Sequence, residues 1–260
     1  MSKFQKFKKP LIVTAIVLGV LVLGAVVVGI LNATVAGGSW SFGWSDYRYD
    51  ESGYEIGSGT VQAPNVTAID VDWIDGSVHI VVCDDMYLSL TEASRLDLTE
   101  DSLLRWHVSE DGKTLTVKYR KSSWFFGSSE NKNKDLILRV PRRMLETLQS
   151  LTVNTVSSNV TLTGVTAKQM NVKSLTGDVT VACKISPETL SVEGTSGKIK
   201  LVLPTDAGFS LEHVTETGRI TVDFRHEQTN GRYVYRVPNA PTTIVKVISP
   251  KGDLTVTYED

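Results

Sequence analysis

Cysteine and histidine are scarce in this 260-residue chain, and each shortage argues against a kind of site. Two cysteines, Cys83 and Cys183, are too few for a disulfide framework. Both follow apolar alternations at nearly the same phase, which favours small buried side chains over a bridge. The four histidines stand singly, with no second ligand two to four residues away, so they do not indicate a metal site. The sequence has no nucleophile-elbow motif and no glycine loop that precedes a helix, so we expect a protein without catalytic residues.

A basic face is also lacking. The net charge is -2, and four of the 27 basic residues are Lys3, Lys6, Lys8 and Lys9. Because residues 10–32 carry no charge, the rest of the chain holds 23 basic against 29 acidic residues. A mildly acidic domain without a basic face argues against a nucleic acid as partner.

The chain has one long apolar run, Leu11 to Leu31, whose most polar side chain is that of Thr14. A helix of this length crosses the ~30 Å hydrocarbon core of a bilayer, so the lipid bilayer is an expected partner. The lysines precede the run and acidic residues follow it. The positive-inside rule therefore predicts a cytoplasmic tail (1–9), a transmembrane helix (10–32) and a C-terminal part on the far side of the cell membrane. A cleaved signal peptide is the alternative, but signal-peptide apolar regions run only about 7–15 residues.

Residues 33–60 are rich in glycine, serine and tyrosine and show no helical or strand period. This composition predicts a juxtamembrane linker, followed by an extracytoplasmic domain over residues 61–260. Trp40, Phe42 and Trp44 follow the apolar run closely, where amphipathic rings favour the membrane interface.

Short apolar–polar alternations recur from residue 61 onward and are separated by tight turns. The turn position falls at Ser158, Gly177, Gly197 and Gly218, so the spacing is 19, 20 and 21 residues. A period near twenty residues with two short strands per unit is typical of stacked coils. The copies cover residues 69–82, 150–164, 170–183, 190–203, 209–224 and 244–258.

The repeat predicts an all-β fold, a single-stranded β-helix or solenoid with coils of about 20 residues, preceded by the transmembrane helix. Gly177, Gly197, Gly218 and Gly252 are expected to have positive φ at the turns. A two-sheet sandwich is the alternative, but the near-constant period favours the coil. The side chains predicted to point inward are those of Val153, Val160, Leu162, Val172, Val179, Val181, Val192, Ile199, Leu201, Leu211, Ile220, Val222, Val247, Leu254 and Val256.

The stretch between the first two copies predicts further strands. Residues 103–120 are typical of a hairpin, and residues 136–141 of a strand that ends at a proline. Between them, Trp124, Phe125 and Phe126 stand in a polar loop. Three adjacent large rings indicate either a lid over the open end of the solenoid or an exposed binding tip.

Two segments carry a resemblance to a known family, LRVPRRMLETLQSLTVNTVSSNVTLTG (138–164) and LPTDAGFSLEHVTETGRITVDF (203–224). A strand, a proline, a Leu-x-x-Leu lead-in and turns of the form Gly-[Asp/Lys/Arg]-apolar-x-apolar resemble the bacterial putative-adhesin family, a domain of unknown function. The resemblance covers about residues 61–260 and departs at Ser158-Asn159, where Gly-Asp is usual. It implies a β-solenoid on the bacterial envelope, often behind one membrane anchor, and it implies no catalytic residues.

Asp70, Asp72 and Asp75 form the densest group of carboxylates in the sequence. Asp70 and Asp72 share a strand face, which makes them candidates for binding calcium, but the spacing lacks the further oxygen ligands that calcium needs. We therefore predict no metal and no cofactor. The expected function is a non-catalytic scaffold or sensor-accessory module that binds an envelope protein or polymer close to the membrane. The alternative is a carbohydrate-active or calcium-dependent β-helix, which needs a carboxylate-lined groove across neighbouring coils.

Overall fold

The fold is known from a computed structural model that describes residues 47–123 and 133–258. The chain divides into two compact units, Met1–Tyr47 and Arg48–Asp260, and the second contains nearly all of the described residues. No helix among these residues is long and apolar enough to cross a membrane. Several predicted features lie outside the described residues, namely the tail (1–9), the transmembrane helix (10–32), the first half of the linker (33–46), Trp40, Phe42, Trp44, Trp124, Phe125 and Phe126.

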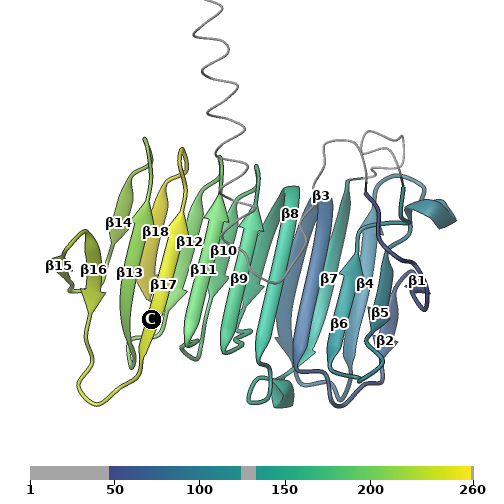
Figure 1. The fold of residues 1–260 in the computed structure, drawn as a ribbon, viewed down its shortest axis with the longest axis horizontal. Coiled ribbons are helices and arrows are strands. Elements are labelled where there is room, and N and C mark those ends of the chain that lie inside the picture. The colour runs from purple at the N-terminus through teal and green to yellow at the C-terminus, as the bar shows by residue number, and fades with distance from the viewer. Residues whose placement is uncertain (1–46, 124–132, 259–260) are drawn as a thin grey trace, which may run out of the picture. The chain divides into compact units, whose positions relative to one another are not determined.

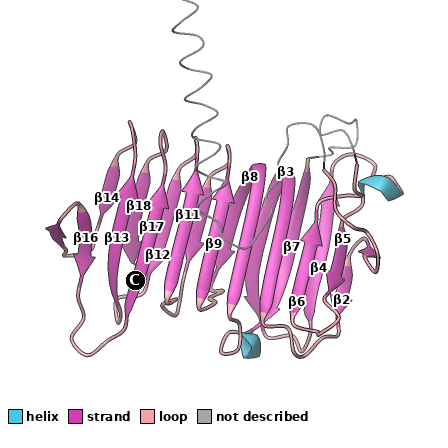
Figure 2. Ribbon diagram, in the orientation of Figure 1, coloured by secondary structure: helices cyan, strands magenta, loops and turns pink. Residues whose placement is uncertain are grey.

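The described part of the unit Arg48–Asp260 is all-β, as predicted, with two short 3-10 helices (Figure 2). The strands are β1 (Glu55–Ile56), β2 (Gly59–Val61), β3 (Ala68–Cys83), β4 (Leu88–Ser94), β5 (Arg105–Val108), β6 (Thr114–Lys118), β7 (Lys134–Pro141), β8 (Ser150–Thr163), β9 (Gln169–Ser174), β10 (Val179–Ala182), β11 (Thr189–Gly194), β12 (Ile199–Leu203), β13 (Gly208–Val214), β14 (Ile220–Val222), β15 (Glu227–Thr229), β16 (Arg232–Tyr235), β17 (Thr242–Ile248) and β18 (Leu254–Tyr258). The 3-10 helices are η2 (Glu100–Ser102) and η3 (Arg142–Met144).

The strands form two rows, which Figure 1 shows one behind the other. Sheet A has the order β1, β5, β6, β3, β8, β9, β11, β17, β13, β16, β15. Sheet B has the order β2, β4, β7, β3, β8, β10, β12, β18, β14. The long strands β3 and β8 belong to both sheets, because their first halves pair in sheet A and their second halves in sheet B. Parallel pairing prevails in the middle of each sheet. Antiparallel pairs occur at both ends of sheet A and at the β2 end of sheet B, whereas β14 at the other end of sheet B pairs parallel with β18.

The core lies between the two sheets and is built from the inward-pointing residues of each strand. Of the side chains predicted to point inward, all but two are buried, among them Val179 and Leu201 at 0% exposure. The exceptions, Ile220 and Val222, are only half-buried. Their strand β14 pairs with β18 on one side and lies at the end of sheet B, so no further coil of the described part of the chain covers them.

The order of the coils in space differs from their order in the chain. At one end, β17 and β18 lie between the coil β11–β12 and the coil β13–β14, which precedes them in sequence. At the other end, β3 lies between β8 and the later coil formed by β6 and β7. A sequence period identifies the coils but carries no information on which coils are neighbours.

The turn glycines are required for a different reason than the one predicted. Gly177, Gly197, Gly218 and Gly252 do not have positive φ, so that expectation was wrong. Instead, the backbones of successive coils approach one another closely at this corner. A Cβ atom on Gly177 would lie 1.8 Å from the carbonyl oxygen of Ser158, and similar short distances occur at the other three glycines. Only glycine allows this approach.

Strands outside the repeat close the stack on the N-terminal side. The predicted hairpin is confirmed as β5 and β6, which pair antiparallel. The predicted strand over residues 136–141 is confirmed as part of β7. The compact unit begins at Arg48 and includes β1, which lies within the predicted linker (33–60), and β2, which spans its end.

Candidate functional site

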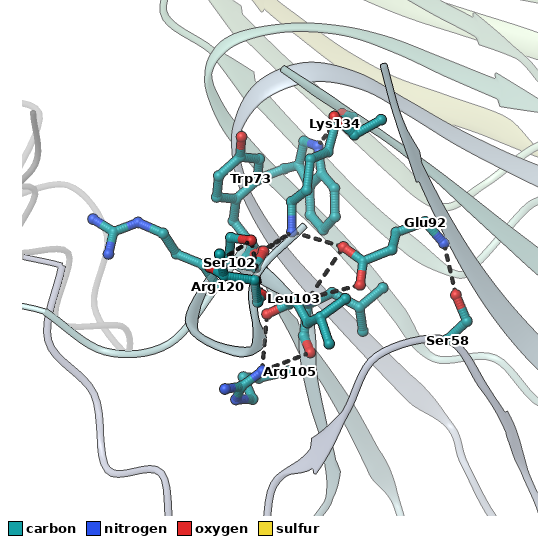
Figure 3. A network of polar contacts seen from close by, with 12 residues as sticks. Ser58, Trp73, Glu92, Ser102, Leu103, Arg105, Arg120 and Lys134 are labelled. Atoms are coloured by element: carbon teal, nitrogen blue, oxygen red, sulfur yellow. Dashed lines mark hydrogen bonds and ion pairs between the residues drawn. The ribbon is translucent and has the colours of Figure 1, made fainter. Parts of the chain in front are cut away.

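The N-terminal side of the core contains a buried ion pair (Figure 3). Lys134 begins β7 and Glu92 lies on β4, and Lys134 Nζ is 2.7 Å from Glu92 Oε2. The two side chains are 0% and 3% exposed. Strand parity explains the burial, because Lys134 precedes the inward Leu136 by two residues and Glu92 follows the inward Leu90 by two.

Each N–H group of the Lys134 ammonium has an acceptor. One bond goes to Glu92, one to the carbonyl oxygen of Ser102 at 2.6 Å, and one to the carbonyl oxygen of Tyr119. The ammonium also lies 4.4 Å from the ring centroid of Tyr119 and 5.1 Å from that of Trp73. Aromatic faces stabilise a desolvated cation at such distances.

The carboxylate of Glu92 is held by the backbone on its other side. The Leu104 N–H donates to both carboxylate oxygens, at 2.9 and 3.1 Å. Burial lowers the pKa of Lys134 to about 8, although the neighbouring Glu92 raises it. Desolvation therefore outweighs the attraction of the carboxylate.

Two buried arginines near this ion pair donate hydrogen bonds to the surrounding loops. Arg105 is 4% exposed and donates to the carbonyl oxygens of Leu103 at 3.0 Å and Glu100 at 2.9 Å. Arg120 is 0% exposed and donates to Ser123 Oγ at 2.7 Å. Arg105 thus satisfies carbonyl groups of irregular backbone that the sheets do not pair, whereas Arg120 binds a side-chain hydroxyl. Because Lys134 and Glu92 are almost completely enclosed, they face no external substrate.

Sequence reasoning missed both Lys134 and Glu92. The available signal was a charged residue at an inward strand position, in LSLTEAS (88–94) and in KDLILRVP (134–141). This signal identifies each residue separately. It does not pair two residues that are 42 positions apart.

The candidate calcium residues are placed as follows. Asp72 forms an ion pair with Lys118 and accepts a hydrogen bond from Asn154 Nδ2 at 3.2 Å. Burial raises the pKa of Asp70, and the nearby Asp72 raises it further. Asp75 accepts a hydrogen bond from Ser157 Oγ at 3.2 Å. Asp70 and Asp72 share one face, as predicted, and Lys118 balances the charge of Asp72.

Across residues 47–123 and 133–258, no three His, Cys, Asp or Glu side chains are grouped so that they could hold a metal ion. Three histidines contact protein groups instead: His107 Nδ1 lies 2.9 Å from the Gly53 carbonyl oxygen, His213 Nε2 lies 2.7 Å from Ser249 Oγ, and His226 Nδ1 lies 2.8 Å from the Phe224 carbonyl oxygen. Both cysteines are free.

The outer face of sheet A carries side chains in regular rows, because the coils stack in register. One row places Thr152, Asn171 and Ser191 on successive strands, all half-exposed. It continues to Lys246 on β17 and Glu212 on β13. We call these five residues the sheet A row. The spacing between neighbours is that of adjacent strands, about 4.8 Å.

An N-terminal segment covers the beginning of the same face. The ring of Tyr54 lies 5.1 Å from that of Tyr49 and 5.2 Å from the imidazole of His107. The Lys118 ammonium lies 5.5 Å from the Tyr49 ring centroid. Residues 48–58 therefore cover Lys118 and its neighbours, and the sheet A row lies beyond them.

The domain is thus an all-β stack of parallel coils. It contains a buried polar network around Lys134 and Glu92 on the N-terminal side, and its outer face carries the sheet A row. The Toastrack DUF4097 profile matches residues 65–195 and again 149–257, which together span most of the chain. The chain therefore belongs to the Toastrack DUF4097 family, and the resemblance to a family of unknown function is confirmed. No curated protein matches the chain significantly.

A solved structure shows the same fold. A protein from Clostridium sporogenes described as a "putative cell adhesion protein" matches with a TM-score of 0.62 at 12% identity, over 79% of this chain and 99% of that chain. A protein from Bacteroides fragilis described as a "putative adhesin" also matches, with a TM-score of 0.32 at 12% identity, over 79% of this chain and 97% of that chain. At 12% identity, the likeness to the Clostridium sporogenes protein shows a shared fold alone.

Proposed function

We propose that the chain is a membrane-anchored envelope protein whose Toastrack domain binds an envelope protein or polymer outside the membrane, without catalysis. The family match, and the likeness to a Clostridium sporogenes protein described as a cell adhesion protein, support an extracellular binding role. The uncharged segment over residues 10–32, preceded by four lysines, supports the anchor and its orientation.

The observation that carries the proposal is the sheet A row. Thr152, Asn171 and Ser191 offer neutral hydrogen-bonding groups at a constant spacing, and Lys246 and Glu212 extend the row with charges of both signs. Regular surfaces of stacked repeats bind extended partners through many equivalent weak contacts. An elongated protein segment or envelope polymer has the matching shape.

The length of the chain between the anchor and the domain limits where this binding takes place. Residues 33–47 separate the predicted transmembrane helix from Arg48. Even fully extended, fifteen residues reach at most about 50 Å. The partner therefore lies in the part of the envelope nearest the membrane, which favours a scaffold or sensor-accessory role over contact between cells.

Binding is tested with two matched double variants of the full chain. Asn171→Arg with Ser191→Arg places two large cations on the outer face of sheet A, and Thr180→Arg with Thr255→Arg places the same pair on that of sheet B. Affinity capture from solubilised envelopes should lose its specific partner with the sheet A variant and keep it with the sheet B variant. Equal capture by both would contradict the assignment of the binding face.

Topology is tested separately on protoplasts. External protease should remove the domain over residues 48–260 and leave residues 1–32 in the membrane. Full protection of the domain in intact protoplasts, together with digestion after lysis, would show that the orientation is reversed.

A further inference from the structure

The Lys134–Glu92 pair has features that an ordinary ion pair does not need. Its amine nitrogen and carboxylate oxygen lie 2.7 Å apart, and the side chains are 0% and 3% exposed. Other ion pairs among the described residues are reached by water, for example Lys173–Glu193, whose side chains are 28% and 22% exposed. From this enclosure and contact geometry we infer that Lys134 and Glu92 become joined by an intramolecular amide bond between Nζ and the Glu92 side-chain carbonyl carbon.

Burial supplies the driving force for this bond. In water, an ammonium and a carboxylate are strongly hydrated, and this hydration favours the separate ions over the amide. Inside a protein each ion loses its hydration, which costs several kcal/mol per ion even after relaxation. Amide formation removes both charges from the core and releases one water molecule, so the enclosed site favours the product that bulk water disfavours.

The atoms balance without another reactant. A proton first moves from the Lys134 ammonium to Glu92 Oε2, which gives a neutral amine and a neutral carboxylic acid. The nitrogen lone pair then attacks the side-chain carbonyl carbon of Glu92. The C–Oε2 bond breaks, and the oxygen leaves as water with its own hydrogen and one proton from the nitrogen. The product is a secondary amide with one N–H.

The neighbouring groups position the reactants for this step. The carbonyl oxygens of Ser102 and Tyr119 hold two N–H groups of Lys134. When the third proton moves to Glu92, the freed lone pair therefore points toward the carboxyl group. The Leu104 N–H lies 2.9 Å from Glu92 Oε1, where negative charge develops as the nitrogen attacks. These backbone groups are positioning groups, fixed by η2 and the ends of β5 and β6.

The electrostatics of the site agree with this geometry. Burial lowers the pKa of Lys134 to about 8, so the uncharged amine that must attack is accessible near neutral pH. The rings of Trp73 and Tyr119 enclose the nitrogen, and the Leu104 N–H contacts the carboxylate. Water, which would hydrolyse an exposed intermediate, is kept away.

The bond would connect two neighbouring strands of sheet B covalently. β4 and β7 are antiparallel partners, and β4 is followed outward only by the short β2 among the described strands. An amide between Glu92 and Lys134 would prevent β4 from separating from the stack while the chain is under tension. Such a cross-link would keep the domain of an anchored envelope protein folded when a bound partner pulls on it.

The test is mass spectrometry of the purified, denatured full chain. The measured mass of the wild-type protein should be lower, by the mass of one water molecule, than the mass calculated from its sequence. Lys134→Met and Glu92→Ala cannot form the bond, so their measured masses should equal the calculated ones. Any processing of the N-terminus shifts all three proteins equally and does not affect the comparison. Lys173→Met, which breaks the half-buried pair with Glu193, should keep the one-water deficit.

Peptide mapping locates the bond. Digestion should give a branched peptide that joins the segment with Glu92 to the segment with Lys134, and both separate peptides should be depleted. If the wild-type mass still equals the mass calculated from the sequence after prolonged incubation of the folded protein, the inference is overturned. A one-water deficit that maps to a cyclised aspartate, such as Asp111 before Gly112, would overturn it as well.

Discussion

The two ends of the stack close the same kind of core in different ways. On the N-terminal side, the enclosed side chains include Lys134, Glu92 and Arg120, packed against aromatic rings. At the other end the enclosure is aromatic: Phe224 lies 5.1 Å from Phe209 and 4.9 Å from Tyr235, measured between ring centroids. Between the two ends, the repeat supplies a regular ladder of buried apolar side chains. On the N-terminal side the closing residues lie outside the repeat, whereas at the other end Tyr235 packs against Phe209 and Phe224 of the copy over residues 209–224, so the two closures differ in chemistry.

The difference has an energetic consequence. An aromatic cluster gains free energy roughly in proportion to the apolar area it buries, and it tolerates small shifts. A buried ion pair contributes little net stability while intact, but it becomes very costly when one partner is lost. The N-terminal closure should therefore be sensitive to single substitutions and tolerant of matched double ones. The C-terminal closure should respond to each substitution according to the volume removed.

The largest loss of stability is expected for a substitution in the middle of the stack, and this loss serves as the reference for substitutions at the ends. Val179 is 0% exposed, so Val179→Asp buries an unpaired carboxylate and should abolish cooperative unfolding. Val222 belongs to the terminal coil and is half-buried, so Val222→Asp should leave a cooperative transition at reduced stability. Thermal unfolding followed by circular dichroism distinguishes the two variants. A normal transition for Val179→Asp would contradict the inward assignment.

The second prediction concerns the N-terminal closure. Lys134→Met leaves the Glu92 carboxylate buried without a cation and should lower the unfolding free energy by at least about 3–5 kcal/mol. Lys134→Met combined with Glu92→Leu removes both charges and should recover the part of this loss that the unpaired carboxylate causes, whereas the part that comes from the lost amide bond should remain. Urea unfolding of the wild type, the single variant and the double variant measures the coupling. If the double variant were less stable than the single one, the buried charge would not be the cause of the loss.

The order of sensitivity could be predicted only in part from the sequence. Period-two alternation and the turn spacing identify the inward valines, because these follow from local chain geometry. The same parity shows that Glu92 and Lys134 point inward, but their partnership depends on two strands meeting across more than forty residues. The half-exposure of Ile220 depends on which coil is last. That is set by the insertion of β17–β18, whose pattern is the same as that of its neighbours.

The turn glycines show a similar limit. Their positions were predictable from the sequence because the repeat marks them. The reason why glycine is needed there was not predictable. A Cβ atom on Gly177 would lie 1.8 Å from the carbonyl oxygen of Ser158 in another coil. A contact between coils becomes visible only when their neighbours are known. The candidate binding face has the same origin, because Thr152, Asn171 and Ser191 form a row only through the register of the stack.

The third prediction concerns the C-terminal closure. Phe224 is 5% exposed and contacts Phe209, Tyr235 and Tyr258. Phe224→Ala should cost about 3 kcal/mol, at the lower end of the range for buried phenylalanine, because a site at the end of the stack collapses more easily. Phe224→Leu should cost clearly less. Urea unfolding measures both, and equal losses for the two variants would show that removed volume does not govern this end.

The smallest effect is a pH dependence at the same end. His213 on β13 is half-buried beside Ser249 Oγ, at 2.7 Å, and burial lowers its pKa. The unfolded chain, in which histidine titrates near about 6.5, therefore binds this proton more readily than the folded protein. Stability from this group is present above that pH and decreases as the pH falls toward the lower folded-state value. His213→Asn should remove this part of the slope between about pH 7 and pH 5. Amide hydrogen exchange of β13 and β17 over that range measures it where it arises, and an unchanged slope in the variant would assign the pH dependence to other groups.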